Sequence, residues 1–224
     1  MQEPEKTAAR DRAEIVKPEG LRARKKLATR QMISDTATRL FMERGFDRVT
    51  IDEVAAAANV SKMTVFNYFA RKEDLFFDID DEVQNLVRDA LARRGRRSPL
   101  AALQTLAHES IENQHDLAKV TPVVAGFWKV VADSAALRAR TRELNEELER
   151  DLSRLLAETV GARTIDPIAR IIAALLLGAW RVAFREALRR QRTTSAAASR
   201  QLIRELLDRG FSAARAAARD SPYV

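Results

Sequence analysis

The chain has 224 residues, of which 46% are hydrophobic and 32% charged, so it can bury a core and is not a disordered protein. It has no cysteine, which excludes disulfides and thiolate sites, and its two histidines are too few for a zinc site. We therefore expect no metal or other cofactor. The net charge of +7 favours a polyanionic partner, although an arginine-rich composition alone gives the same balance.

No segment predicts a membrane or export signal. The longest apolar run, Ile171 to Ala179, is well short of the ~20 residues that a membrane span needs. The N-terminus, Met1 to Arg12, is charged and has no apolar signal region. We expect a cytoplasmic protein with no membrane partner, and a flexible tail over residues 1–20.

The spacing of apolar residues predicts an all-α fold of about nine helices, because no segment alternates as a strand would. The first helix begins near Leu21 to Ala28, with an apolar face that includes Ile33 and Phe41. Gly45 is expected to end it in a left-handed conformation, with Phe46 packing back on Phe41 as in a Schellman cap.

The next segment predicts two short helices with a tight turn between them. Thr50 and Glu53 have the spacing of a capping box, and the helix that they begin runs to about Ala58. Asn59 tolerates the left-handed geometry of the turn, and Ser61 can cap a second helix that ends near Phe69. Two short helices with fixed starts and a turn between them predict a helix-turn-helix.

The rest of the chain predicts further amphipathic helices. One runs from after Arg71 to near Gly95, on a stripe that starts with Leu75, Phe76 and Ile79. The others are expected at about 99–120, 122–131, 137–160, 168–188 and 195–218, several of them opened by a proline or a capping serine.

The stretch from Arg30 to Phe76 resembles the N-terminal domain of the tetracycline-repressor (TetR) family. The matching elements, in order and without gaps, are LFMERGF, Thr50–Ile51, Val54–Ala55, Val60–Ser61, Thr64, an aromatic at Phe66, Tyr68–Phe69 and Lys72–Leu75. The resemblance implies a three-helix, homeodomain-like DNA-binding domain over residues 21–70 and a helical ligand-binding and dimerisation domain over residues 71–224. It further implies a dimeric regulator, usually a repressor, that binds a palindromic operator in double-stranded DNA and leaves it when a small molecule binds.

The second short helix then holds the candidates for reading bases. Asn67 can pair with adenine, Met63 and the Thr64 methyl can contact thymine, and Lys62 can donate to guanine or phosphate. Thr50, Tyr68 and Lys72 are candidates for phosphate contacts, and Arg24 and Lys25, with Arg22, Lys26 and Arg30, form a candidate basic arm. Ser61 and Phe66 are also expected among the residues that contact DNA. Each has a plainer alternative: Ser61 as a cap alone, Phe66 as a packing residue, Lys72 or the basic cluster as solvated charge.

Three residues depart from the family pattern. Asn59 and Met63 stand where glycine is common, and Arg71 stands where a capping serine is frequent. These changes leave DNA binding intact but predict a bulkier reading surface and a different sequence preference.

By the same resemblance, residues 166–218 are expected to form the homodimer interface, and their apolar faces are broader than one chain needs. A ligand pocket is expected among the middle helices. The candidate lining residues are His108, His115, Phe127, Trp128, Trp180 and Phe184. Few charges are expected in the interior, so an apolar small molecule is the expected effector.

The residues leave two other classes of function open. A basic protein that binds nucleic acid without sequence preference would show steep salt dependence and no consensus site. An enzyme on a helical scaffold would need His108 or His115 with a carboxylate, but the sequence has no nucleophile–base spacing and no glycine-rich phosphate loop. The sequence favours the regulator.

Overall fold

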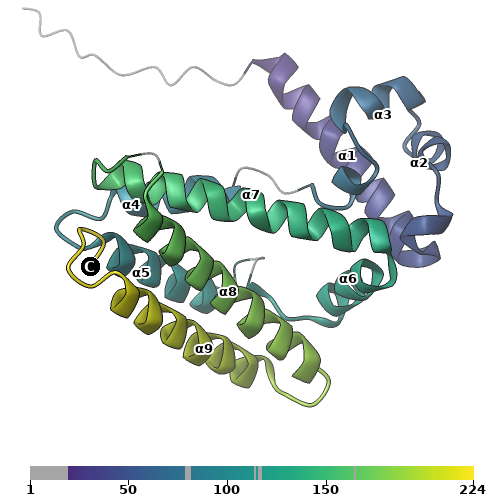
Figure 1. The fold of residues 1–224 in the computed structure, drawn as a ribbon. Coiled ribbons are helices and arrows are strands. Elements are labelled where there is room, and N and C mark those ends of the chain that lie inside the picture. The colour runs from purple at the N-terminus through teal and green to yellow at the C-terminus, as the bar shows by residue number, and fades with distance from the viewer. Residues whose placement is uncertain (1–19, 79–81, 114, 116–117, 164) are drawn as a thin grey trace, which may run out of the picture.

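The computed structural model describes residues 20–78, 82–113, 115, 118–163 and 165–224. Within these ranges the chain forms nine α-helices, two 3-10 turns and no strand, which confirms the predicted all-α class (Figure 1). The expected flexible tail lies, except for Gly20, outside the described residues. The helices are α1 Leu21–Arg44, α2 Ile51–Ala57, α3 Lys62–Tyr68, α4 Glu82–Ala92, α5 Pro99–Glu112, α6 Pro122–Asp133, α7 Ala135–Thr159, α8 Pro167–Arg190 and α9 Ala196–Ala217.

Helices α1, α2 and α3 gather at one end of the molecule, and α4 to α9 form the larger bundle beside them (Figure 1). Gly45 ends α1 with a φ of 86°, and its N–H donates to the Phe41 carbonyl at 2.9 Å. The predicted contact of Phe46 with Phe41 is confirmed, with ring centroids 4.9 Å apart. The Schellman cap itself is wrong, because a ψ of 144° turns the chain outward into a 3-10 turn, η1 Phe46–Arg48.

Local capping fixes the helix-turn-helix as predicted. The Thr50 N–H donates to Glu53 Oε2 at 2.7 Å, and the Glu53 N–H donates to Thr50 Oγ1 at 3.2 Å. The hydrogen bond from the Thr50 backbone, with further bonds from Arg44 and the Thr50 side chain, lowers the pKa of Glu53 to about 2. Asn59 adopts the left-handed turn with a φ of 53°, and Ser61 Oγ accepts the Thr64 N–H at 3.0 Å.

Two predicted helices are wrong in extent. After Arg71 the chain forms a 3-10 turn, η2 Glu73–Leu75, and the described part of α4 runs from Glu82 to Ala92. Ile79, which the sequence pattern placed on the same stripe, lies outside the described residues. Leu75 and Phe76 are buried against the core of α1 instead of on the face of α4. Helix α5 ends at Glu112, well before Val120, and its last turn is closed by the Asn113 N–H donating to the Glu109 carbonyl at 2.9 Å.

The last four helices match the prediction, and each begins at a side-chain cap. Asp166 Oδ1 caps α8 by accepting the Ile168 N–H at 2.9 Å. Its other oxygen, Oδ2, accepts a hydrogen bond from the Tyr223 hydroxyl at 2.5 Å. This hydrogen bond lowers the pKa of Asp166, although partial burial of the carboxylate opposes the shift. Tyr223 is fully buried and thereby ties the segment after α9 to the start of α8.

One apolar core continues from the three N-terminal helices into the bundle. It combines Ile33, Phe41, Val54, Val65 and Phe69 with Leu75 and Phe76, and it also contains Val131 of α6 and Leu137 of α7. The remaining core residues lie between α4, α5, α7, α8 and α9. Helix α1 is therefore packed on α6, and the 3-10 turn after α3 is packed on α7.

Helix α8 is covered on only part of its circumference. By length and composition alone it could cross a membrane. The length of its uninterrupted apolar run, Ile171 to Ala179, did not predict this. Only 28% of its apolar window is buried, and Ile171 and Val182 are 45% and 60% exposed. The single chain therefore leaves an apolar face of α8 open.

Helices α8 and α9 cross closely at Gly210. A Cβ at this position would lie 2.3 Å from Ala179 Cβ and 3.8 Å from its Cα, so a side chain cannot be accommodated without moving one helix. We expect Gly210→Ala to lower the free energy of unfolding by about 1–3 kcal/mol, measured by chemical denaturation. The matched control is Gly178→Ala, where the nearest atom is the flexible Arg181 guanidinium at 3.9 Å. Equal stability of the two variants would contradict the close crossing.

Candidate functional site

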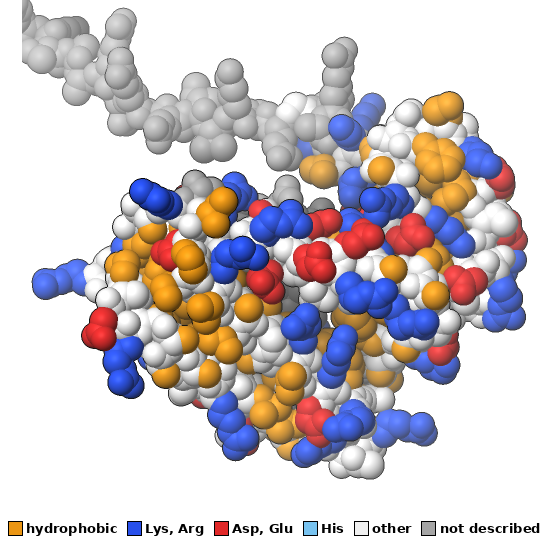
Figure 2. Space-filling model, in the orientation of Figure 1, with side chains coloured by type: hydrophobic (Ala, Val, Ile, Leu, Met, Phe, Trp, Pro, Cys, Tyr) orange, Lys and Arg blue, Asp and Glu red, His pale blue; other side chains and the backbone are white. Residues whose placement is uncertain are grey.

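The outer face of α3 presents three large uncharged side chains to solvent. Met63 is 68% exposed, Phe66 is 45% exposed, and Asn67 lies exposed beside them, while Val65 and Phe69 on the opposite face are buried. The interpretation of Phe66 as a packing residue is therefore wrong, because its helix turns it away from the core. The burial of Phe69, by contrast, is as predicted. The exposed end of the molecule formed by α1 to α3 carries apolar and basic side chains together (Figure 2).

The hydroxyl groups near this face are already used as helix caps. Thr50 holds the start of α2, and Ser61 holds the start of α3. Thr64 shares a 2.8 Å hydrogen bond with the Ser61 hydroxyl. Tyr68 is half-buried against the first core. These residues fix where α3 lies, and Thr50, Ser61 and Thr64 remain near solvent.

Two groups of basic side chains are free of strong internal partners. Lys62 Nζ lies 2.8 Å from Asp52 Oδ2, but both side chains are more than half exposed, so the pair contributes only ~0–1 kcal/mol and can be exchanged for another anion. Arg24 and Lys25 are exposed at the start of α1 and form no ion pair with a described residue. The side chain of Arg22 lies outside the described residues.

Arg30 differs from the other members of the predicted basic arm. Its Nε donates to Asp78 Oδ1 at 2.8 Å, and its Nη1 donates to the Tyr68 carbonyl at 2.9 Å. Its guanidinium also lies 4.5 Å from the centre of the Phe69 ring. Arg30 therefore ties α1 to the end of α3 and to Asp78.

Lys72 also points inward. Its Nζ donates to the Phe46 carbonyl at 2.6 Å and lies 4.2 Å from the centre of the Phe46 ring and 5.5 Å from that of Phe41. Burial lowers the pKa of Lys72, although nearby carboxylates oppose the shift. The ammonium thus has a structural role that the sequence did not indicate.

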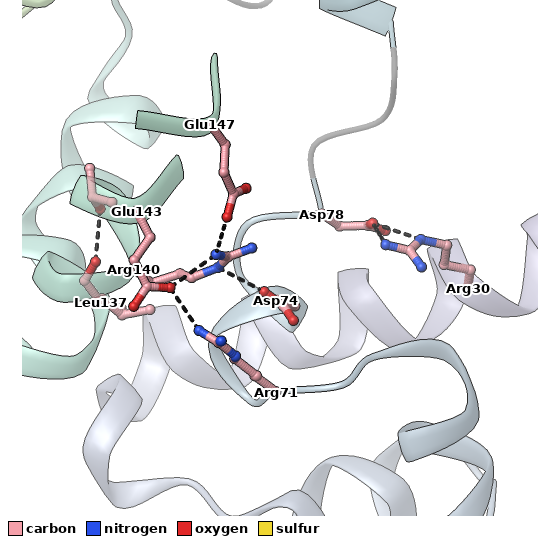
Figure 3. Close-up of polar contacts among 9 residues, drawn as sticks. Arg30, Arg71, Asp74, Asp78, Leu137, Arg140, Glu143 and Glu147 are labelled. Atoms are coloured by element: carbon pink, nitrogen blue, oxygen red, sulfur yellow. Dashed lines mark hydrogen bonds and ion pairs between the residues drawn. The ribbon is translucent and has the colours of Figure 1, made fainter. Parts of the chain in front are cut away.

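Polar contacts join the segment after α3 to α7 (Figure 3). Arg140 donates from Nε to Asp74 Oδ1 at 2.9 Å and from Nη1 to Glu143 and Glu147 at 3.1 and 3.0 Å. Arg71 donates to the same Glu143 carboxylate at 2.7 Å. Although partial burial opposes its charge, the bonds to Glu147 and Glu143 raise the pKa of Arg140. Arg71, which stands where the family often has a capping serine, is thus paired within the chain.

The bundle encloses a cavity of about 570 Å³, a size that suits a drug-like molecule. Its lining is mostly apolar and comes from α4 to α9 and from the segment Phe76–Asp78. Four of the six predicted ligand residues line it: Phe127, Trp128, Trp180 and Phe184.

The two histidines do not line this cavity. His108 Nε2 lies 2.8 Å from Asp208 Oδ1 and thereby links α5 to α9, and Gln104 donates to the same oxygen at 2.6 Å. Although burial opposes the change, these two bonds lower the pKa of Asp208. His115 lies beyond the end of α5 and is likewise absent from the lining.

Aromatic rings connect the cavity to α1. Phe127 stacks on Phe76 with centroids 4.1 Å apart and planes 5° from parallel, and Phe76 meets Phe41 edge-on at 5.8 Å. On the cavity side, Trp128 contacts both Phe127 and Phe184. The apolar periodicity placed Phe76 on the stripe of a helix, so its position between the cavity and α1 was not predicted.

Comparisons with known proteins agree with this geometry. Residues 33–79 match the sequence profile described as "Bacterial regulatory proteins, tetR family". The chain is 28% identical over 172 residues to the transcriptional regulator TcmR of Streptomyces glaucescens, an alignment that covers 75% of this chain and 76% of TcmR. It is 29% identical over 170 residues to MftR of Mycobacterium tuberculosis, a putative regulator of mycofactocin biosynthesis, covering 69% and 77% of the two chains.

Solved structures share the fold. The crystal structure of NalD, the secondary repressor of the MexAB-OprM efflux pump in Pseudomonas aeruginosa, superposes with a TM-score of 0.55. The superposition covers 82% of this chain and 97% of NalD at 20% identity, which shows a common architecture.

The contacts of Lys72 lead to a prediction about stability. Replacing Lys72 by Met removes the donor to the Phe46 carbonyl and the cation over two rings, so we expect a loss of about 1–2 kcal/mol in chemical denaturation. Lys129→Met is the control, because Lys129 forms only an exposed pair with Asp133. A Lys72→Met protein that is as stable as wild type but binds DNA weakly would instead assign the ammonium to phosphate.

Proposed function

This chain belongs to the tetR family of bacterial transcriptional regulators, and from that premise we propose that it is a homodimer that binds a palindromic operator and leaves it when a small molecule fills the cavity. The observation that carries the proposal is the outward face of α3, where Met63, Phe66 and Asn67 stand exposed on a helix capped at its start. Residues 21–70 would bind DNA, and residues 71–224 would bind the effector and the second subunit.

The composition of this face suits a major groove. Asn67 offers an amide that can donate to and accept from an adenine edge, and Met63 and Phe66 offer apolar contacts for thymine methyl groups. Lys62, Thr50, Thr64, Tyr68 and the start of α1 with Arg24 and Lys25 surround these residues and would contact phosphates. Lys72 and Ser61 would act mainly by holding the helices in place.

The open face of α8 supports a dimer. Ile171 and Val182 lie exposed on a helix whose apolar window is only 28% buried, and a second copy of α8 and α9 would cover them. Two-fold symmetry would set two recognition helices against successive major grooves, which is why the operator would be palindromic.

The link between cavity and DNA would run through Phe76. Phe127 stacks on Phe76, and Phe76 contacts Phe41 of α1. A ligand that displaces the Phe127 ring would therefore also shift Phe76, and through it the core beneath the DNA-binding helices. Such a ligand would release DNA only if it prefers a dimer whose α3 helices no longer fit the grooves. The usual mode of the family, repression, follows if the operator overlaps a promoter.

We propose a regulatory role in the cytoplasm rather than catalysis. His108 pairs with Asp208 outside the cavity lining, and Gln104 donates to the same carboxylate oxygen. Among the described residues, no three His, Asp or Glu side chains are grouped to hold a metal ion.

Asn67 provides the test of base reading. We expect Asn67→Ala to weaken binding to the best duplex, selected from random sequences, by about 1–3 kcal/mol and to relax the preference at one base position. Fluorescence anisotropy with matched duplexes would measure both effects. Asn85→Ala, an exposed asparagine on α4, is the control. Equal weakening on every duplex, or selection that returns no symmetric consensus, would point to non-specific binding.

Val182 provides the test of the dimer. A carboxylate placed on the open apolar face of α8 would have to be desolvated in the interface, so we expect Val182→Glu to give monomers in sedimentation velocity and to lose operator affinity. Val123→Glu on α6 adds the same charge at a position that is 74% exposed and should leave the dimer intact. If Val182→Glu remains dimeric, the interface lies elsewhere.

A further inference from the structure

We infer that the cavity takes an amphipathic anion, that is, an apolar body that carries one carboxylate or similar oxyanion. The inference rests on the proposed function in one respect only, namely that the cavity binds a small molecule. It goes further because it assigns a charge to that molecule and names the two residues that would recognise it, Arg181 and Arg185.

The charged side chains in the described lining are mostly basic. Among the described residues, two cationic side chains, Arg181 and Arg185, and one acidic side chain, Asp78, border the cavity. Asp78 is already neutralised, because Arg30 Nη2 lies 2.6 Å from its Oδ1 and its side chain is only 7% exposed. The net charge that a ligand meets from these lining residues is therefore positive.

The two arginines have no competing partner in the part of the chain that the structure describes. Neither forms an ion pair or a hydrogen bond there, whereas Arg189 and Arg190 farther along the same helix share Glu186. On the face shown in Figure 2, basic side chains lie over α7 and α8, with acidic side chains among them over α7. An oxyanion would supply the acceptors that these guanidinium groups lack, and Arg is suited to bind it through two parallel hydrogen bonds.

The arginines also stand next to the aromatic part of the wall. Arg181 follows Trp180, and Arg185 follows Phe184, so both lie one helical turn apart on α8 beside rings that line the cavity. The remaining wall is built from leucines and other apolar residues of α4, α5 and α7, among them Leu86, Leu103, Leu144 and Leu148. A ligand would place its apolar body among these and its charge at α8.

Intrinsic fluorescence can test this charge preference directly. The chain has two tryptophans, Trp128 and Trp180, and both line the cavity. Three probes of equal chain length would be titrated into the full-length protein below their micelle concentrations: decanoate, decanol and decyltrimethylammonium. We expect decanoate to bind about tenfold more tightly than decanol, as charge-assisted hydrogen bonds imply, and the cation to bind most weakly. Added salt should weaken decanoate and leave decanol unchanged.

The arginines are tested by substitution. In Arg181→Gln/Arg185→Gln we expect the preference for decanoate over decanol to disappear while decanol binding stays the same. Arg170→Gln, an exposed arginine near the start of α8 that lies outside the lining, should keep the wild-type preference. Thermal denaturation would establish that the variants remain folded.

Three results would overturn the inference: no fluorescence response to decanoate, equal or tighter binding of decanol or the cation, or a preference that survives in the double variant. Release of a labelled operator is measured separately. Decanoate that binds with the expected preference but leaves DNA bound would count against the effector part of the proposed function and would support the charge assignment.

Discussion

The ring of Phe76 lies flat on Phe127 and edge-on to Phe41, so one side chain belongs both to the wall of the cavity and to the core under α1. Helices α2 and α3 have seven residues each, too short to be stable by themselves. They depend on that core for their position. Any change in the cavity that moves Phe76 therefore acts on the surface that supports the reading helix.

The polar contacts around Phe76 limit how it can move. Arg140 and Glu143 of α7 hold Asp74 and Arg71, and Arg30 of α1 holds Asp78. The described stretch from Arg71 to Asp78 is thus held to the bundle through Arg71 and Asp74 and to α1 through Asp78. Such an arrangement favours two discrete positions of a packed unit over gradual bending.

The elements that could be predicted from the sequence are those fixed by neighbouring residues. The capping box at Thr50, the left-handed Asn59 and the Ser61 cap involve partners three or fewer residues away, and all three are present. The four aromatic residues expected in the cavity also lie there. Periodicity failed where it could not say which core an apolar residue joins: Leu75 and Phe76 fit a helical stripe but pack under α1. The bonds of Arg140 to Asp74 and of His108 to Asp208 join residues 66 and 100 positions apart, and such pairs leave no local signal.

The shared core has a consequence for anyone who wishes to isolate the DNA-binding part. A fragment cut just before Arg71 would keep α1 to α3 but would lose Leu75 and Phe76, together with Val131 and Leu137 from α6 and α7. The exposed flank of Phe41 and Phe69 would then face water, and Arg30 would lose Asp78. Such a peptide would be prone to aggregate, so helices α1 to α3 are best studied while still attached to the bundle of α4 to α9.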